Sequence, residues 1–208
     1  MSCRHRLAAM FCAAVLATAP SALAQNGDQP GGGGAADDPM AAMMEAARPG
    51  PEHELLKQFV GTWRARAVMW FGPEPMTSEG TMTNTLVLDG RFLRHEYEAD
   101  MMGEPFKGLG YWGYDKGRKE WVGTWMDTWS TGIMTSRRGT YDAASKTWTM
   151  HATYFNPETG EEEKQKEVVK VIDPDTHVMQ MFMVGPGGEE QKVMEITYTR
   201  KAAGGGRE

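Results

Sequence analysis

Six residues in the middle of the chain combine aromatic rings with polar groups, a mixture that is typical of pockets for small molecules. We expect them to line a ligand site in which the rings contact the apolar part of the ligand and the polar groups orient it. They are Trp121, Trp125, Asp127, Trp129, Arg138 and His151.

An enzymatic alternative uses the polar members of this set. Asp127, Arg138 and His151 would then have to lie within about 4–6 Å of a common point and titrate with shifted pKa values. The sequence contains no nucleophile elbow, phosphate-binding loop or dinucleotide-binding fingerprint. We therefore predict no catalytic residues and keep the enzyme as an alternative to a binding protein.

Residue spacing gives little support to metal or haem chemistry, so we predict no cofactor and no metal site. Haem ligation by one histidine and Cu(I) binding by thioethers stay open as alternatives. The 17 methionines, three of which alternate at Met179, Met181 and Met183, are better explained by adaptable packing or by an apolar ligand lining. Four histidines follow residue 24, none of them in an H-x-x-x-H pattern: His53, His95, His151 and His177.

The strand pairing around the six residues follows from a repeated pattern, Tyr-Asp-x-x-x-Lys-x-Trp, which begins at Tyr114 and again at Tyr141. The Asp favours a turn, and the Tyr and Trp can pair across the resulting hairpin. Pairing Tyr114 with Trp121 sets large side chains against glycine, which suits a curved barrel wall. The predicted pairs are Trp112 with Gly123, Gly110 with Trp125, Gly108 with Asp127 and Phe106 with Trp129.

Extension of this register brings Arg138 and His151 onto the face of Trp125, if Ser130-Thr131 forms a two-residue turn and no bulge intervenes. The opposite face is more uniformly apolar, so the sequence leaves open which face is interior. That face carries Leu109, Tyr111, Val122, Met126, Ile133, Trp148, Met150 and Tyr154.

Ten short segments with the composition of strands position all of these residues. Asp89-Gly90 predicts a tight hairpin, and Pro-rich or Gly-rich turns separate several other segments. A strand meander of this length has to close on itself to avoid unpaired edges. We predict an all-β fold, a closed antiparallel up-and-down barrel with strands over 62–71, 77–88, 91–101, 105–114, 120–129, 132–141, 147–155, 163–172, 176–184 and 190–200.

The barrel domain is expected over residues 51–201, and its opening segment predicts a short helix that caps one end. The chain begins like a secretory signal over residues 1–24, with two arginines, an apolar run and Ala22-Leu23-Ala24. We expect export to the periplasm or outside after cleavage near Ala24. Residues 25–50 predict a disordered tether, in which Met40–Ala47 could form a turn or two of helix, and residues 202–208 predict a disordered tail.

Composition narrows the classes of partner. The chain has 28 acidic and 22 basic residues and a net charge of −6, which argues against nucleic acid and anionic membrane surfaces. No segment reaches the length of an apolar membrane span. Both cysteines, Cys3 and Cys12, lie in the predicted signal, so the barrel needs no disulfide and has no thiol chemistry. The oligomeric state is not indicated.

Several stretches resemble known families. Gly61-Thr62-Trp63 and Arg200 are similar to the calycin barrels, which include lipocalins and fatty-acid-binding proteins and pack a Trp of the first strand under an Arg of the last. Stretches across residues 51–201 resemble a bacterial family named domain of unknown function 1579 (DUF1579). That resemblance implies a lipocalin-like barrel and no established activity. The matching stretches include Phe59-Val60-Gly61-Thr62-Trp63, Leu88-Asp89-Gly90-Arg91-Phe92-Leu93 and Val193-Met194-Glu195-Ile196-Thr197-Tyr198.

The sequence therefore predicts an exported lipocalin-like barrel that binds a small, largely apolar molecule in its interior, since a barrel of eight or more strands has room for one ligand. Two alternatives remain. One is the enzyme that uses Asp127, Arg138 and His151. The other is a structural or envelope-interaction protein whose interior is filled by its own side chains.

Overall fold

The structure, a computed structural model, describes residues 38–156 and 159–202. The predicted signal, the tether up to residue 37 and the tail from residue 203 lie outside the described residues. The helical elements are α1 (Pro39–Ala46), α2 (Pro51–Glu54) and the 3₁₀ helix η1 (Leu55–Phe59). The strands are β1 (Gly61–Met69), β2 (Met76–Val87), β3 (Phe92–Met101), β4 (Glu104–Asp115), β5 (Glu120–Asp127), β6 (Met134–Asp142), β7 (Thr147–Asn156), β8 (Glu161–Asp173), β9 (Thr176–Val184) and β10 (Glu190–Arg200).

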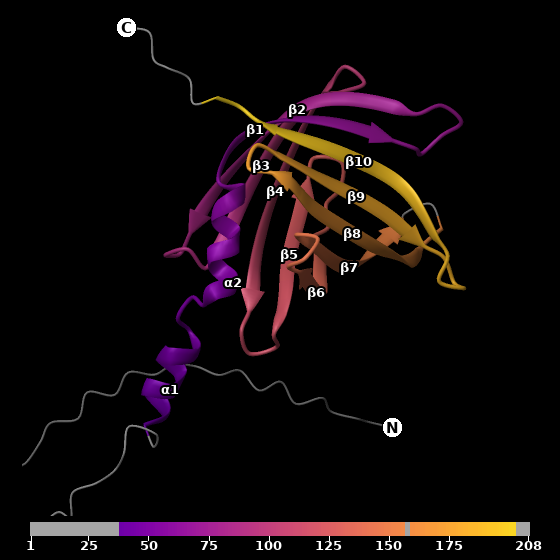
Figure 1. Cartoon of the computed structure of the whole chain (residues 1–208). Coiled ribbons are helices and arrows are strands. Elements are labelled where there is room, and N and C mark those ends of the chain that lie inside the picture. The colour runs from indigo at the N-terminus through magenta and orange to yellow at the C-terminus, as the bar shows by residue number, and fades with distance from the viewer. Residues whose placement is uncertain (1–37, 157–158, 203–208) are drawn as a thin grey trace, which may run out of the picture. The chain divides into compact units, whose positions relative to one another are not determined.

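The ten strands form a closed antiparallel barrel in which each strand pairs with its neighbours in sequence and β1 pairs with β10 (Figure 1). The predicted up-and-down barrel is confirmed, and the predicted strand ends differ from the observed ones by at most two residues. The strand ends are well predicted because turn residues mark them. Asp89 and Gly90, for example, both adopt positive φ in the β2–β3 turn, as a two-residue hairpin of this type requires.

Closure depends on one pairing at the end of the barrel where β1 begins. Trp63 lies opposite Arg200, and the guanidinium carbon of Arg200 lies 4.0 Å from the centre of the Trp63 ring. Arg200 also donates hydrogen bonds to the carbonyl oxygens of Val60 (2.7 Å) and Gln58 (2.8 Å). The stack and these charge-assisted bonds join the last strand to the segment that precedes the first. Arg200 thus lies over the Trp63 ring, as the resemblance to the calycin barrels implies.

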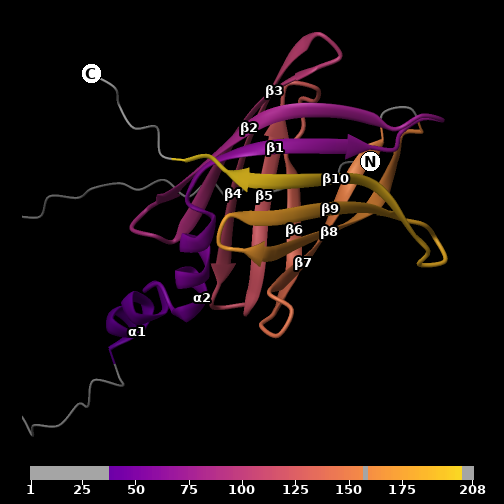
Figure 2. The ribbon, with the colours of Figure 1, turned by 45° about the horizontal axis from the view of Figure 1, so that its top comes forward.

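The short helix that was expected to cap the barrel is α2 continued by η1. Pro51 occupies the start of α2, where its missing N–H costs nothing. Leu56 and Phe59 of η1 are fully buried and pack against Trp112, Trp148 and their neighbours. Figures 1 and 2 show α2 beside the barrel end at which β1 begins. Burial of these two apolar side chains seals that end.

The preceding helix, α1, lies within the segment expected as a tether, where one or two turns of helix were expected. All of its residues are exposed. Its last turn is held by cations of the barrel, since Arg91 donates to the carbonyl of Ala47 (3.1 Å) and Lys116 to the carbonyls of Glu45 (3.3 Å) and Arg48 (3.0 Å). Such side chains stabilise the unpaired carbonyls at a helix C-terminus. None of the helices in the described part of the chain is long and apolar enough to cross a membrane.

Candidate ligand site in the barrel interior

Two regions of the barrel interior differ in how far their side chains are buried. The sealed end is the buried cluster under α2 and η1, made of Leu56, Phe59, Leu93, Trp112, Trp121, Trp148, Met150 and Val169. The open wall is the set of inward-facing, partly exposed side chains of β5 to β10 farther from these helices. It consists of Trp125, Asp127, Met134, Ala152, Glu167, Met181, Met183 and Met194.

Strand register shows why the open wall faces inward. Residues on one strand face alternate with those on the other, and the buried residues Val169 and Trp148 pair with each other and fix the inner face of β7 and β8. Glu167 is two residues from Val169 and lies opposite Met181 of β9. A carboxyl group and thioethers therefore share the inner surface with aromatic rings.

A second buried cluster covers the inner face of β1 to β4 and β10, so this side of the interior is packed. Its members include Ala65 and Ala67, whose small side chains leave room for larger neighbours. Met179 contacts both buried clusters, and Trp125 and Met194 of the open wall pack against the second one. The cluster consists of Trp63, Ala65, Ala67, Met69, Met82, Tyr97, Met101, Phe106, Ile196 and Tyr198.

Two histidines, His95 and His177, lie beside the sealed end and are neutral. Burial lowers the pKa of His95 to about 4, and burial together with the charges of His95 and Arg200 lowers the pKa of His177 to about 3. His95 Nδ1 lies 2.9 Å from Asn84 Oδ1, while the Asn84 amide nitrogen donates to the Phe59 carbonyl (3.0 Å). Since Asn84 Oδ1 can only accept, His95 carries its proton on Nδ1.

Glu167 is the acidic group whose environment is most unusual. Burial raises the pKa of its carboxyl to about 7. Burial also raises the pKa of Tyr198, and the charges of Tyr97 and Glu167 add to this rise. Two further polar atoms in the interior, Gln165 Oε1 and His177 Nδ1, are buried and have no hydrogen-bond partner among the described residues. Interior groups of this kind are uncommon in folded proteins and point to a functional site.

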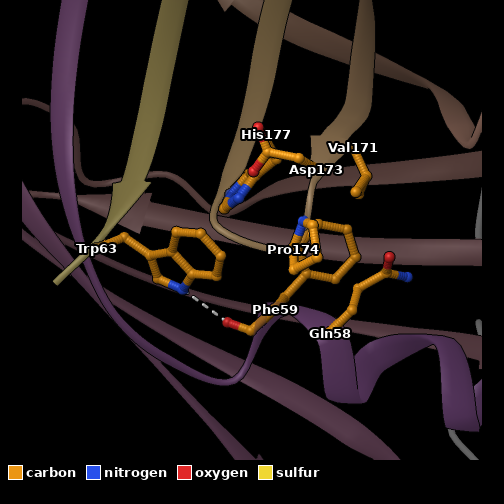
Figure 3. A pocket seen from close by; sticks show the side chains of 7 residues that line it. All are labelled: Gln58, Phe59, Trp63, Val171, Asp173, Pro174 and His177. Atoms are coloured by element: carbon orange, nitrogen blue, oxygen red, sulfur yellow. Dashed lines mark hydrogen bonds between the residues drawn. The ribbon is translucent and has the colours of Figure 1, made fainter. Parts of the chain in front are cut away.

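A small cavity at the sealed end is too small to be that site. It has a volume of about 30 Å³ and lies between η1 and the β8–β9 turn (Figure 3). The Trp63 indole N–H is used inside the protein, because it donates to the Phe59 carbonyl (2.8 Å). The space suits a water molecule, whereas pockets for small organic ligands are at least about tenfold larger. Its lining residues are Gln58, Phe59, Trp63, Val171, Asp173, Pro174 and His177.

Four of the six residues predicted for the ligand site lie on β5 or shortly after it, and the three on the strand, Trp121, Trp125 and Asp127, have the predicted pairing to β4. Gly110 pairs with Trp125 and Gly108 with Asp127. A Cβ on Gly110 would lie 3.0 Å from Trp125 Cε3, and one on Gly108 would overlap the ring, so the indole lies flat over both glycines. Trp125 Nε1 donates to Asp127 (2.9 Å), which sets the orientation of the ring.

The other two rings do not belong to the open wall. Trp121 is 2% exposed and packs with Trp112 and Trp148 at the sealed end, at ring-centre distances of 5.4 and 5.8 Å. Trp129 is 51% exposed, beyond the end of β5, with its ring centre 5.1 Å from that of Phe106. Trp121 is thus a core residue, and Trp129 lies at the rim of the barrel.

Arg138 and His151 lie on the outer surface, so the predicted register beyond β5 is wrong. A bulge interrupts the β5–β6 pairing between Trp121 and Gly123 and the β6–β7 pairing between Arg137 and Thr140. Arg138 has a φ of +54° and is exposed, as is its neighbour Arg137. One extra residue reverses the faces of every later position. His151 is therefore exposed, and the buried residues of β7 are Trp148 and Met150.

The sequence left open which of the two strand faces is interior. The ring-bearing face is interior before this bulge, and the opposite face is interior after it. Before it, the ring-bearing face of β4 and β5 is inside, and Tyr111 of the alternative core is 37% exposed. After it, Trp148 and Met150 of the alternative core are inside. Asp127, Arg138 and His151 therefore do not share a pocket.

Glu167 was not identified as a site residue from the sequence, although the alternation of residues in β8 indicates its inward position. In β8, Lys164, Lys166 and Lys170 alternate with Gln165, Glu167 and Val169. The regular lysines mark the outer face, and the carboxyl group then falls on the inner one. The run of three glutamates that precedes this stretch obscures the pattern.

Loops at the end of the barrel away from α2 carry several exposed apolar side chains. The β1–β2, β3–β4 and β5–β6 connections all lie there, because alternate turns of an up-and-down barrel share one end. Exposed apolar groups are common singly, but grouping at one rim suggests contact with an apolar partner or ligand. The loop residues are Phe71, Met102, Trp129 and Ile133, and Phe155 lies near the end of β7.

Comparison with known proteins identifies a family and a fold. Residues 48–200 match the family described as Protein of unknown function (DUF1579). Rv2717c from M. tuberculosis has a similar structure, with a TM-score of 0.55 and 16% identity over 74% of this chain and 100% of that one. The S-type phycobiliprotein lyase CPES from Guillardia theta has a TM-score of 0.52 and 15% identity over 74% and 99% of the two chains. No curated protein matches the sequence.

The histidines and carboxylates do not converge on a metal site. Within residues 38–156 and 159–202, no group of three or more His, Cys, Asp or Glu side chains is arranged to hold a metal ion. His95 and His177 are each used in packing or hydrogen bonding with neutral neighbours.

Proposed function

Because the chain belongs to the family described as Protein of unknown function (DUF1579), whose description assigns no activity, we propose a function from the geometry of the barrel. The barrel binds a small, largely apolar molecule against its open wall. The phycobiliprotein lyase and Rv2717c share the fold at low identity and contribute the architecture to this proposal.

One observation carries the proposal: inward-facing side chains of the open wall remain partly exposed, although the other end of the same interior is sealed. Met181 and Met183 are partly exposed at inward positions of β9, whereas Trp148 and Leu93 at the sealed end are 0% exposed. An unneeded interior would be expected to pack fully, since every unburied apolar side chain forgoes about 1.5–3 kcal/mol of stabilisation.

The chemistry of the open wall indicates the kind of molecule. Thioethers and indoles offer polarisable, adaptable contact to apolar groups, and Met134, Met181, Met183 and Trp125 supply four such side chains. Asp127 and Glu167 are the polar groups that would orient a bound molecule. This mixture is typical of sites for small organic ligands.

The proposed function can be tested by introducing one large side chain that occupies the space beside the open wall. Ala152 faces inward, between Ser136 and Gln165 on the neighbouring strands, and the next residue, Thr153, is exposed on the outer face. Ala152→Phe should abolish binding of apolar probes detected by tryptophan fluorescence and calorimetry. Thr153→Phe, which places the same aromatic ring on the other face, should leave binding unchanged.

A ligand-free structural barrel is the competing outcome. It predicts no response of the wild-type protein to lipid, haem or aromatic libraries, and equal behaviour of the two phenylalanine variants. Native mass spectrometry of the protein purified from its own source would show directly whether a small molecule is bound.

We also propose that the protein is exported, on the strength of the signal pattern over residues 1–24. The same native mass measurement tests this proposal, because the mature chain should begin near Gln25. An intact N-terminus in the fractionated native protein would contradict it.

A further inference from the structure

Glu167 introduces a carboxyl group into an otherwise apolar part of the barrel interior. It lies on the inner face of β8, between Gln165 and Val169, and pairs with Met150 on one side and Met181 on the other. Gln165 and Val169 are buried, while Glu167 is partly exposed. A molecule that contacts the open wall can therefore reach the carboxyl group.

No cation within residues 38–156 and 159–202 forms an ion pair with this carboxyl group. Among the described residues, Glu167 takes part in no hydrogen bond or ion pair, and burial is the cause of its raised pKa of about 7. The lysines of β8 occupy outward positions, and Lys166 contacts Glu190. A carboxylate that is largely withdrawn from water and has no partner is costly, so the ionised form of Glu167 would be stabilised by a cation that comes from outside.

The other ionisable groups of the interior do not fill this role. Tyr97 and Tyr198 have raised pKa values and stay neutral, and Tyr198 is close enough to respond to the charge of Glu167. His95 and His177 stay neutral because burial lowers their pKa values to about 4 and about 3. The other inward carboxyl group, Asp127, already accepts hydrogen bonds from the Trp125 indole and the Trp129 backbone N–H. Glu167 is thus the inward carboxyl group without a partner among the described residues, and neutral aromatic rings, which themselves favour cations, lie in the same interior.

We propose that the ligand of the open wall is an amphiphilic amine, whose ammonium group pairs with Glu167 and whose apolar part contacts the methionines. This inference rests on the proposed binding function and assigns the class of ligand to it. An anionic ligand, such as a fatty acid, would meet the carboxylate unfavourably, and a neutral ligand would leave it unpaired.

Three probes of nearly equal size separate these cases: 2-phenylethylamine, 2-phenylethanol and phenylacetate. Their affinities for the full chain are measured by calorimetry at pH 8, where Glu167 is ionised. We expect the amine to bind at least tenfold more tightly than the alcohol, and phenylacetate to bind more weakly than both. Glu167→Gln should reduce the affinity for the amine to that for the alcohol.

A matched control lies on the same strand. Glu162 is exposed on the outer face of β8, so Glu162→Gln makes the same chemical change outside the barrel and should preserve the tenfold preference. Equal binding of amine and alcohol, or tighter binding of phenylacetate, would overturn the assignment of the ligand while leaving the binding function intact. Failure of all three probes to bind overturns the assignment and also counts against the binding function.

The pH dependence of the affinity can be measured on the unmodified protein, so this test does not require that the Glu167→Gln variant folds. The amine stays protonated between pH 6 and pH 8, whereas a carboxyl group with a pKa of about 7 ionises across this range. The affinity for 2-phenylethylamine should rise by about tenfold from pH 6 to pH 8. The affinity for 2-phenylethanol should not rise, and a parallel rise for both probes would exclude Glu167 as the cause.

Discussion

The sealed end and the open wall share strands β5, β7 and β8 but differ in how closely their side chains pack. At the sealed end, Phe59, Trp112 and Trp148 form a network of rings with centres 5.2–5.6 Å apart. At the open wall, flexible thioethers and a carboxyl group remain partly exposed. The difference shows that the interior is fully packed at one end and incompletely packed along the open wall. Under the proposed function, the packed end stabilises the barrel and the open wall binds the ligand.

The largest expected effect comes from removing a ring at the sealed end. Trp148 is 0% exposed, and Trp148→Ala should lower the free energy of unfolding by about 3–5 kcal/mol, through lost burial and the cavity that remains. Met183→Ala at the open wall should cost less than half as much, because this side chain is already partly exposed. Urea denaturation measures both. Similar losses would show that the two regions are equally important for stability.

A second test adds volume at the open wall itself. A Cβ on Gly108 would overlap the Trp125 ring, so Gly108→Ala should destabilise the barrel by about 1–3 kcal/mol. Gly132→Ala serves as control, since a Cβ there has nothing within 4 Å. Combining Gly108→Ala with Trp125→Leu should recover part of the loss in thermal unfolding. An additive loss would mean that the strain has another source.

Acidification should lower the free energy of unfolding through the buried histidines beside the sealed end. The pKa of His177 falls from its usual value of 6.5 to about 3 in the folded protein. The unfolded chain therefore binds the proton first, and stability is lost as pH falls below 6.5, by about 1.4 kcal/mol for each pH unit and each such histidine. His177→Phe should flatten the decline between pH 6.5 and pH 4.5 in denaturation experiments.

Glu167 affects the pH dependence of stability in the opposite direction to His177. The two contributions therefore have to be measured separately. Its pKa rises from 4.5 to about 7 on folding, so the stability that it contributes is full below pH 4.5 and is lost as pH rises through 7. The histidine measurement is therefore made in a Glu167→Gln background. A pH profile that His177→Phe leaves unchanged in that background would refute the assignment to His177.

The smallest effect concerns the closure of the barrel. Arg200→Lys keeps the charge but loses the planar stack on Trp63 and the paired bonds to Val60 and Gln58. We expect a loss of about 1 kcal/mol in the free energy of unfolding. Arg64→Lys on the outer face, where the guanidinium forms an exposed pair with Glu79, should have no measurable effect. Equal behaviour of the two variants would contradict a special role for Arg200.

The fold was predictable from local signals that repeat along the chain. Alternation and turn residues set the ten strands, and the pairs of Tyr114 with Trp121 and Trp63 with Arg200 occur as expected. The site was only partly predictable, because the β6 bulge at Arg138 has no distinctive residue: an arginine with positive φ looks like any other surface arginine. From that point the register is lost, and with it the position of His151.

The methionines of the open wall also make the interior sensitive to oxidants. Met181 and Met183 face inward and remain accessible, so peroxide can convert their thioethers into sulfoxides without unfolding the protein. Each conversion replaces an apolar contact with a polar, chiral one, while the buried indoles at the other end are shielded. Under the proposed function, oxidation at these two positions would therefore change which molecules the open wall can bind.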